Sequence, residues 1–193
     1  MTLLQVMPDD APDRVLLRTR DEKEIDHTLR ECSVRLRRWP VRGTVEPGTT
    51  ADELIDRYRS EVDELCAREG LRLVDAVQFH PEDTPGWREH AAKAREVFLE
   101  EHRHSEDEVR FFAQGVGCFY LHVGSRVYAV VCEAGDLLSV PAGTTHWFDM
   151  GPRPEFCAVR FFERENGWIG DFTGDPIARH FPRLDALLAG SCE

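Results

Sequence analysis

The second half of the sequence is a series of short β-branched and aromatic runs, and this pattern restricts the fold more than any other feature. From about Glu101 the runs read VRFFAQ, GCFYLHV, RVYAVVC, DLLSV, HWFDM and EFCAVRFFE. The residues that punctuate them are Gly115, Gly117, Gly124, Gly135, Gly143 and Gly151. Several short strands at this spacing are typical of an antiparallel sandwich or barrel.

The first hundred residues favour helices. Residues 21–30 read as a helix, and Thr50 and Glu53 form a capping box before a long apolar stripe that ends at Gly70. Residues 71–79 read as a strand, and residues 86–100 as another helix. With no internal repeat or linker, we expect one domain over residues 1–193. Its helical N-terminal part, residues 1–100, would pack on a β-barrel core at about 101–165, and the tail from Trp168 shows no clear pattern.

Composition excludes several classes of protein. The formal charge of −12 argues against binding nucleic acid, which needs a basic face. No apolar run approaches the roughly 18 residues of a membrane span, and the N-terminus lacks the basic and apolar regions of a secretory signal. We therefore expect a cytoplasmic protein with no membrane partner. The six cysteines form no C-x-x-C pair, so zinc ribbons and redox motifs are not expected. We expect buried thiols at Cys118, Cys132 and Cys157.

The string EHRHSEDEVRFFAQG carries the clearest chemistry. On a regular strand His102, His104 and Glu108 would point to one face. Two imidazoles and a carboxylate suit Fe(II), Mn(II), Ni(II) or Zn(II). Arg110 has the same parity and would point into the same pocket. A bulge or turn at residues 105–107 would break this parity, and H-x-H alone is also common as a pair of surface histidines.

A second string, GDLLSVPAGTTHWF, strengthens the metal hypothesis. Gly135, Pro141, Gly143 and His146 follow the spacing G-x5-P-x-G-x2-H. Proline and glycine there predict a tight turn that leads into a strand beginning near the histidine.

Together the two strings resemble the paired motifs of the cupin superfamily. His102, His104, Glu108 and Gly115 fall in register with the first motif, and the residues of the second string with the second. The chain departs at Glu96, where the first motif has glycine, and at Met150, where the second has asparagine. The resemblance implies a mainly β, cupin-type double-stranded β-helix (jelly-roll) barrel with N-terminal α-helices packed on it. It also implies a metal site of His102, His104, Glu108 and His146.

A closer resemblance is to the acireductone dioxygenase family, over roughly the whole chain. That family has E-H-x-H-x-x-x-E-x-R-F at its metal strand, which matches residues 101–111, and it shares the departures at Glu96 and Met150. The resemblance implies oxidation of 1,2-dihydroxy-3-keto-5-methylthiopentene with O₂ in methionine salvage. One divalent metal per chain is implied, Fe²⁺ or Ni²⁺. Iron would give formate and 4-methylthio-2-oxobutanoate, whereas nickel would give formate, CO and 3-methylthiopropionate.

The same resemblance implies roles for individual residues. Arg110 would help to generate the substrate dianion. Glu101 and Asp107 match positions with a role in metal incorporation or in relaying local conformational change; the alternative is that both are solvated acids beside a charged loop. From parity, Phe148 could pack on the methylthio chain; Arg160, flanked by apolar residues, would make a second anion contact or a salt bridge. The expected partners are the acireductone and O₂. Nothing suggests an obligate assembly, and we expect a monomer.

Other functions remain open on the sequence alone, because a cupin fold does not determine the reaction. A metal-dependent isomerase or decarboxylase is one alternative, and a non-catalytic metal- or ligand-binding cupin is another. A hydrolase built on H-x-H is a weaker third, since its usual further ligands are missing. Arg110 and the aromatic residues after the metal strand favour the dioxygenase.

Overall fold

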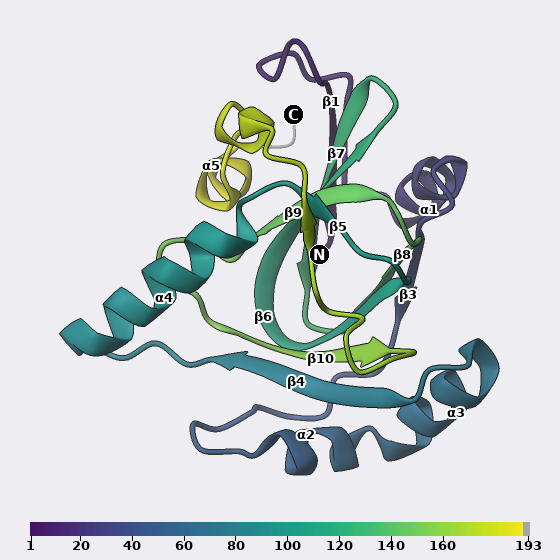
Figure 1. Ribbon diagram of the computed structural model, residues 1–193, viewed down its shortest axis with the longest axis vertical. Helices are drawn as coiled ribbons and strands as arrows, with labels where there is room; N and C mark the ends of the chain where they lie inside the picture. Colours follow the sequence, from purple (N-terminus) through teal and green to yellow (C-terminus); the bar gives the residue numbers. More distant parts are fainter. Residues whose placement is uncertain (191–193) are drawn as a thin grey trace.

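The computed structural model describes residues 1–190, and it is mainly β (Figure 1). The strands are β1 (Leu3–Pro8), β2 (Leu17–Thr19), β3 (Arg35–Arg38), β4 (Leu73–Phe79), β5 (His102–Arg103), β6 (Glu108–Val123), β7 (Arg126–Glu133), β8 (Asp136–Val140), β9 (Thr145–Asp149), β10 (Phe156–Phe162) and β11 (Asp171–Phe172). The helices are α1 (Glu22–Glu31), α2 (Ala51–Arg57), α3 (Arg59–Glu69), α4 (Pro85–Phe98), the short 3₁₀ helix η1 (Pro176–Arg179) and α5 (Leu184–Ala189).

All strand pairs are antiparallel, and β6 is the central strand. The order along the main path is β11-β5-β9-β6-β7-β1-β2. The first half of β6 pairs with β8 and β10, while its second half pairs with β7 and β9. The arrangement is compatible with the predicted barrel.

The prediction of two separate strands within residues 109–123 was wrong, because β6 runs unbroken through Gly115 and Gly117. Gly115 has a φ of +76°, and a Cβ there would lie 1.9 Å from the carbonyl oxygen of Glu155. A Cβ on Gly117 would lie 2.3 Å from the Phe148 ring. These glycines allow close approach of neighbouring residues within a continuous strand and do not end it.

The first hundred residues contribute strands as well as helices, so the expectation of a helical N-terminal part was incomplete. β1 pairs with β7, β3 with β8, and β4 with β10. Only β4 had been predicted, because β1 is a mostly apolar run with a single polar residue, Gln5, and β3 is a short, arginine-rich one, and neither shows clear alternation.

The predicted helices form, with one interruption. Asp21 caps α1, and the capping box of Thr50 and Glu53 begins α2. The long helix expected up to Gly70 breaks at Tyr58, which ends α2 and precedes α3. Tyr58 is buried and packs its ring 4.7 Å from that of Phe111.

Side-chain alternation along β6 and β10 separates two apolar clusters. Val109, Phe111 and Phe161 pack with α2 and α3; in Figure 1, α2 lies beneath β4 and α3 lies at the right-hand end of that strand. Phe112 and Ala158 face the opposite side, the interior of the sheet. The residues Glu108, Arg110 and Arg160 share that inward parity, so the sheet directs their charges into the interior.

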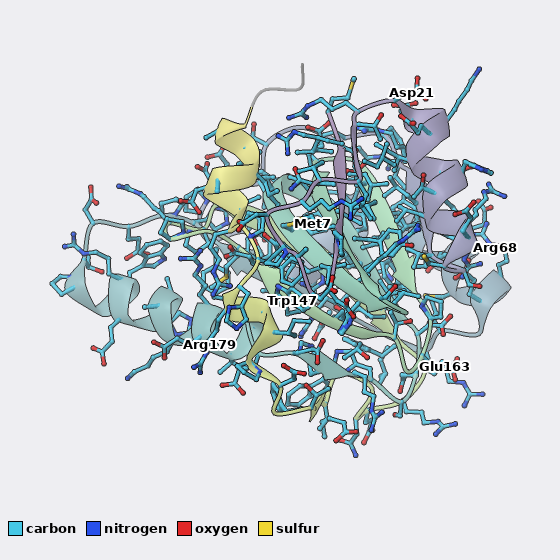
Figure 2. The ribbon with its side chains drawn as sticks, turned by 90° about the horizontal axis from the view of Figure 1, so that it is seen from above. Met7, Asp21, Arg68, Trp147, Glu163 and Arg179 are labelled. Atoms are coloured by element: carbon cyan, nitrogen blue, oxygen red, sulfur yellow. The ribbon has the colours of Figure 1, made fainter. Side chains whose placement is uncertain are left out.

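The surrounding side chains fill the molecule densely (Figure 2). Met7 lies in the middle of the view and is fully buried, whereas Asp21 lies at the edge, at the start of α1. As predicted, the thiols Cys118, Cys132 and Cys157 are buried, and the five cysteines among residues 1–190 are free. Cys192 lies outside the described residues. Within residues 1–190, no helix has the length and apolar character needed to cross a bilayer.

Candidate metal centre

Three histidines from separate segments converge inside the sheet. His102 on β5 is paired directly with His146 on β9, and His104 follows in the turn between β5 and β6. One ring nitrogen from each lies within 4.8 Å of the others. His102 and His146 are buried, and only 9% of the His104 side chain is exposed.

Of the two possibilities left open for His102, His104 and Glu108, the structure has the turn at residues 105–107 and not the regular strand. β5 ends at Arg103, a bend at Ser105 and Glu106 follows, and Glu108 is the first residue of β6. The side chains therefore converge through the turn and through the pairing of β5 with β9. The parity argument holds only within β6, for Glu108 and Arg110.

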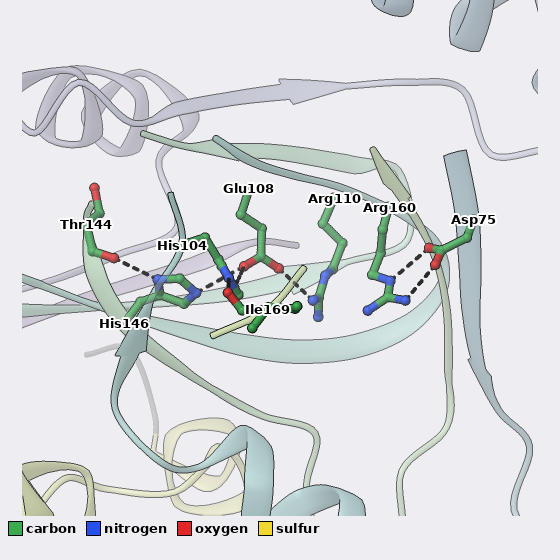
Figure 3. A network of polar contacts seen from close by, with 8 residues as sticks. All are labelled: Asp75, His104, Glu108, Arg110, Thr144, His146, Arg160 and Ile169. Atoms are coloured by element: carbon green, nitrogen blue, oxygen red, sulfur yellow. Dashed lines mark hydrogen bonds and ion pairs between the residues drawn. The ribbon is translucent and has the colours of Figure 1, made fainter. Parts of the chain in front are cut away.

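Backbone carbonyls determine which nitrogen each histidine presents. Nδ1 of His102 lies 2.7 Å from the carbonyl oxygen of Glu100, and Nδ1 of His146 lies 2.9 Å from that of Thr144. Nδ1 of His104 lies 3.1 Å from the carbonyl oxygen of Ile169 (Figure 3). Because a carbonyl oxygen only accepts, each Nδ1 must donate a proton, and Nε2 is left with its lone pair when the ring is neutral.

Glu108 lies among these nitrogens. Its Oε2 is 3.1 Å from Nε2 of His104 and 3.0 Å from Nε2 of His146. Arg110 donates from Nη2 to its Oε1 at 2.6 Å. Burial alone would raise the pKa of Glu108, but the charge of Arg110 and the two histidine contacts outweigh it and hold that pKa well below its ordinary value.

The histidines respond to burial in different ways. Burial and the neighbouring His146 lower the pKa of His102 to about 4. Burial would also lower the pKa of His104, but its hydrogen bond to Glu108 reverses the effect and raises that pKa. At neutral pH His102 is therefore uncharged, and the uncharged imidazole is the form that binds metals.

Arg110 is held rigidly beside this centre. It is buried, and its guanidinium carbon lies 4.9 Å from the ring centroids of both Phe119 and Phe148. Its Nε is buried without a hydrogen-bond partner in residues 1–190. A buried donor without a partner is costly, so this face of Arg110 is suited to an anionic ligand.

The centre opens into a cavity of about 400 Å³. The histidines, Glu108, Arg110 and Arg160 form its polar end. Its other lining residues are apolar apart from Gly170, namely Val97, Phe98, Phe119, Phe148, Phe162, Trp168, Ile169 and Phe172. Sequence reasoning missed the contribution of the tail, because Trp168, Ile169 and Phe172 lie in a segment without a regular apolar period.

Phe148 and Arg160 both line this cavity. Phe148 lies in the cavity wall and also packs among core aromatic residues, with its ring centroid 4.9 Å from that of Phe119. Arg160 lines the cavity and also forms a salt bridge with Asp75, at 2.9 and 2.7 Å. Both interpretations offered for Arg160, an inward-facing cation and a salt-bridge partner, are therefore compatible with its position.

The flanking acids Glu101 and Asp107 do not join the donor group. Glu101 accepts hydrogen bonds from His122 and Thr173, at 2.7 Å each. His122 is not among the residues that line the cavity. Asp107 accepts from the backbone N–H of Ala142 at 2.9 Å, in the turn before His146.

Glu106, which the sequence analysis did not single out, binds another backbone segment in the same way as Asp107 binds Ala142. Its carboxylate is buried and accepts hydrogen bonds from the backbone of Glu163 and Arg164, the latter at 3.3 Å. This segment leads to Ile169, whose carbonyl orients His104. The acidic turn between His104 and Glu108 thus binds two distant segments. One contains the Thr144 carbonyl, which orients His146, and the other leads to the Ile169 carbonyl, which orients His104.

Comparisons with known proteins match almost the whole chain. The family model of the ARD/ARD′ family matches residues 3–170. "Acireductone dioxygenase 1" of Nocardia farcinica is 59% identical over 97% of this chain and 100% of the relative. "Acireductone dioxygenase" of Frankia alni is 52% identical over 99% of this chain and 93% of the relative.

A solved structure shows the same fold. It is titled "Acireductone dioxygenase from Bacillus anthracis with cadmium ion in active center". It covers 89% of this chain and 98% of its own, with a TM-score of 0.73 and 24% sequence identity. The mainly β, cupin-type fold predicted from the sequence is confirmed by this likeness and by the strand content.

Proposed function

The chain belongs to the ARD/ARD′ family, and from this premise we propose that it cleaves the acireductone 1,2-dihydroxy-3-keto-5-methylthiopentene with O₂, as an acireductone dioxygenase of methionine salvage. It is an enzyme of this class, since relatives more than 50% identical over nearly its whole length carry that name. The same relatives weigh against a cupin isomerase, a decarboxylase and a non-catalytic binding protein.

The observation that carries the proposal is the close contact of two imidazole Nε2 atoms with one oxygen of a buried carboxylate. Nε2 of His104 and Nε2 of His146 lie 3.1 and 3.0 Å from Oε2 of Glu108, while each Nδ1 donates its proton to a carbonyl. If both rings are neutral, the lone pair on each Nε2 faces the lone pairs of Oε2 of Glu108, and the two repel each other. A cation among these atoms removes the repulsion, so the donor set fits a divalent metal.

We assign four side chains to this metal: His102, His104, Glu108 and His146. Three imidazoles and one carboxylate accept both Fe²⁺ and Ni²⁺, with higher intrinsic affinity for Ni²⁺, so one ion of either kind per chain is compatible with the residues. A bound divalent metal would act as a Lewis acid and template for the ionised substrate. Iron is expected to give formate and 4-methylthio-2-oxobutanoate; nickel is expected to give formate, CO and 3-methylthiopropionate.

Arg110 supplies positive charge for the substrate. An acireductone is an enediol that must lose protons before it reacts readily with O₂. The Arg110 guanidinium is fixed between Phe119 and Phe148, and its buried Nε has no hydrogen-bond partner within residues 1–190. A fixed, buried cation stabilises an oxygen anion more than a mobile, solvated one does, so Arg110 favours ionisation of the bound enediol.

The remaining lining residues fit the rest of the substrate. The apolar side chains of Phe148, Phe98 and Phe162 border the polar end of the cavity and suit a methylthio chain. Their rings also exclude water from the reacting oxygens, which strengthens the interactions with Arg110. Arg160 adds a second positive charge at the same end. Glu101 and Asp107 are assigned indirect roles, in metal incorporation and in holding the turn before His146.

Anaerobic loading of the purified protein with Fe(II) or Ni(II), followed by addition of acireductone and O₂, tests the proposal. We expect substrate absorbance to fall far faster than in the uncatalysed reaction, and CO to appear only with nickel. No acceleration with either metal would contradict the proposed reaction. Metal analysis of protein from its native source would identify the ion used there. The cytoplasmic location, the monomeric state and the single domain over residues 1–193 stay predictions.

A further inference from the structure

Three charged residues form a row across three neighbouring strands. Arg160 on β10 pairs directly with Arg110 on β6 on one side and with Asp75 on β4 on the other. Residues directly opposite each other in antiparallel strands project from the same face of the sheet. Arg110 and Arg160 both line the cavity, and Figure 3 shows Asp75 at the outer end of the row.

Asp75 fixes the orientation of Arg160. Nε of Arg160 donates to Oδ1 at 2.9 Å, and Nη2 donates to Oδ2 at 2.7 Å. This bidentate contact fixes the plane of the guanidinium, and Nη1 is the nitrogen that it does not use. Arginine otherwise has many rotamers, so a free Arg160 would lose more entropy on binding an anion.

Charge repulsion makes this restraint necessary. Two arginines directly opposite each other on adjacent strands repel. Each has its own carboxylate here: Glu108 at 2.6 Å from Arg110, and Asp75 at 2.7 Å from Arg160. Without Asp75, nothing in the row would offset the repulsion of Arg160 by Arg110, and the long side chain could turn toward solvent.

The Asp75–Arg160 pair contributes little to stability. Almost half of the Asp75 side chain is exposed, and a fifth of the Arg160 side chain. Ion pairs this exposed are screened by water and add little to the free energy of unfolding. The main effect of Asp75 is therefore to orient Arg160 in the cavity.

We propose that Asp75 is a positioning residue for substrate binding: it holds Arg160 in the cavity, so that Arg160 and Arg110 bind the oxygens of the ionised acireductone together. This inference rests on the proposed function, since the acireductone is the anion concerned. It assigns to β4, outside the metal strand and the histidine turn, a part in substrate affinity.

The test uses Asp75→Ala and Asp75→Asn in the metal-loaded enzyme. Substrate affinity is measured by anaerobic titration with the acireductone, and KM and kcat by turnover in O₂. We expect Kd and KM to rise about tenfold or more, the range expected when a charge-assisted hydrogen bond is lost. kcat should change less, and metal content and Tm should stay near those of the wild type. Asp75→Glu, which keeps the carboxylate, should restore part of the affinity.

A double-mutant cycle separates positioning from a purely structural role. If Asp75 acts through Arg160, the variant Asp75→Ala/Arg160→Ala binds substrate no more weakly than Arg160→Ala alone. Glu69→Gln is the matched control, because Glu69 on α3 pairs with Arg35 and Arg37, whose strand β3 pairs with β8, and neither arginine lines the cavity. Its Kd and KM should equal those of the wild type.

Two results would overturn the inference. One is a Kd of Asp75→Ala equal to that of the wild type. The other is a fold-change in Kd of the double variant that equals the product of the fold-changes of Asp75→Ala and Arg160→Ala. Both are read against a wild-type enzyme that turns over the acireductone. If the wild-type enzyme loaded with either metal did not turn it over, the proposed function itself would fail, whatever the variants showed.

Discussion

Arg110 and Glu108 lie two residues apart on one face of β6, both buried, and share a hydrogen bond of 2.6 Å. The pair links the histidine cluster to the cavity, because Glu108 contacts the histidines and Arg110 lines the cavity. Changes on either side of this contact should therefore have different consequences.

On the cavity side, Arg110→Ala should leave the metal bound at saturating metal concentration while kcat/KM falls by roughly 10²- to 10³-fold, the cost of losing one fixed donor to a developing oxyanion. Without metal, the variant should unfold more easily, by about 3–5 kcal/mol, because Glu108 loses its cation. Arg110→Lys keeps the charge but not the planar fork and should be intermediate. Steady-state kinetics and urea titration check both effects; unchanged turnover would reduce Arg110 to a structural role.

On the metal side, His104→Ala should lower bound metal at least tenfold in elemental analysis after dialysis, because one of four donors is lost. His27→Ala is the matched control, since His27 lies on α1 with 80% of its side chain exposed. The control should retain a full complement of metal. Full occupancy in His104→Ala would contradict the assignment of His104 as a ligand.

Asp149 should make stability depend on pH. Its buried carboxylate accepts two hydrogen bonds from Arg95 and one each from the backbone of Gly151 and Leu184. Burial would raise the pKa of Asp149, but these contacts outweigh it and lower that pKa. A lowered folded-state pKa stabilises the protein above the unfolded value of about 4, and this contribution is lost as the pH falls through the folded value.

Asp149→Asn should therefore cost about 3–5 kcal/mol at pH 7, because Arg95 loses its buried partner. The difference in unfolding free energy between wild type and variant should be constant from pH 8 to pH 5 and shrink below about pH 4. Urea titrations at several pH values measure it. A difference that did not shrink in acid would show that the charge of Asp149 is not its source.

Two glycines with the same backbone conformation should tolerate alanine differently. Gly70 and Gly115 have φ of +75° and +76°, but a Cβ on Gly70 would meet nothing within 4 Å, whereas one on Gly115 would meet the Glu155 carbonyl at 1.9 Å. Gly70→Ala should lower the free energy of unfolding by about 1–2 kcal/mol, from backbone strain alone. Gly115→Ala must also separate β6 from the segment before β10, so we expect at least about 2 kcal/mol more. Equal melting temperatures would show that the backbone moves freely there.

The sequence by itself determined the features that depend on neighbours along the chain. The cap at Thr50, the stop at Gly70 and the shared parity of Glu108 and Arg110 follow from short spacings, because helix caps and strand alternation are local. The motifs around His102 and His146 indicated a metal centre through their resemblance to the cupin motifs, although a turn stands where a regular strand was one of the two possibilities.

The tertiary structure decided which distant groups meet. Ile169 lies 65 residues from His104, and Asp75 lies 85 residues from Arg160, yet each orients its partner by hydrogen bonding. The continuity of β6 through Gly115, and the cavity wall built from Trp168 and Phe172, likewise depend on close packing between segments. The chain's local spacing contains no information on such contacts, because strand register and turn geometry determine which residues lie opposite each other.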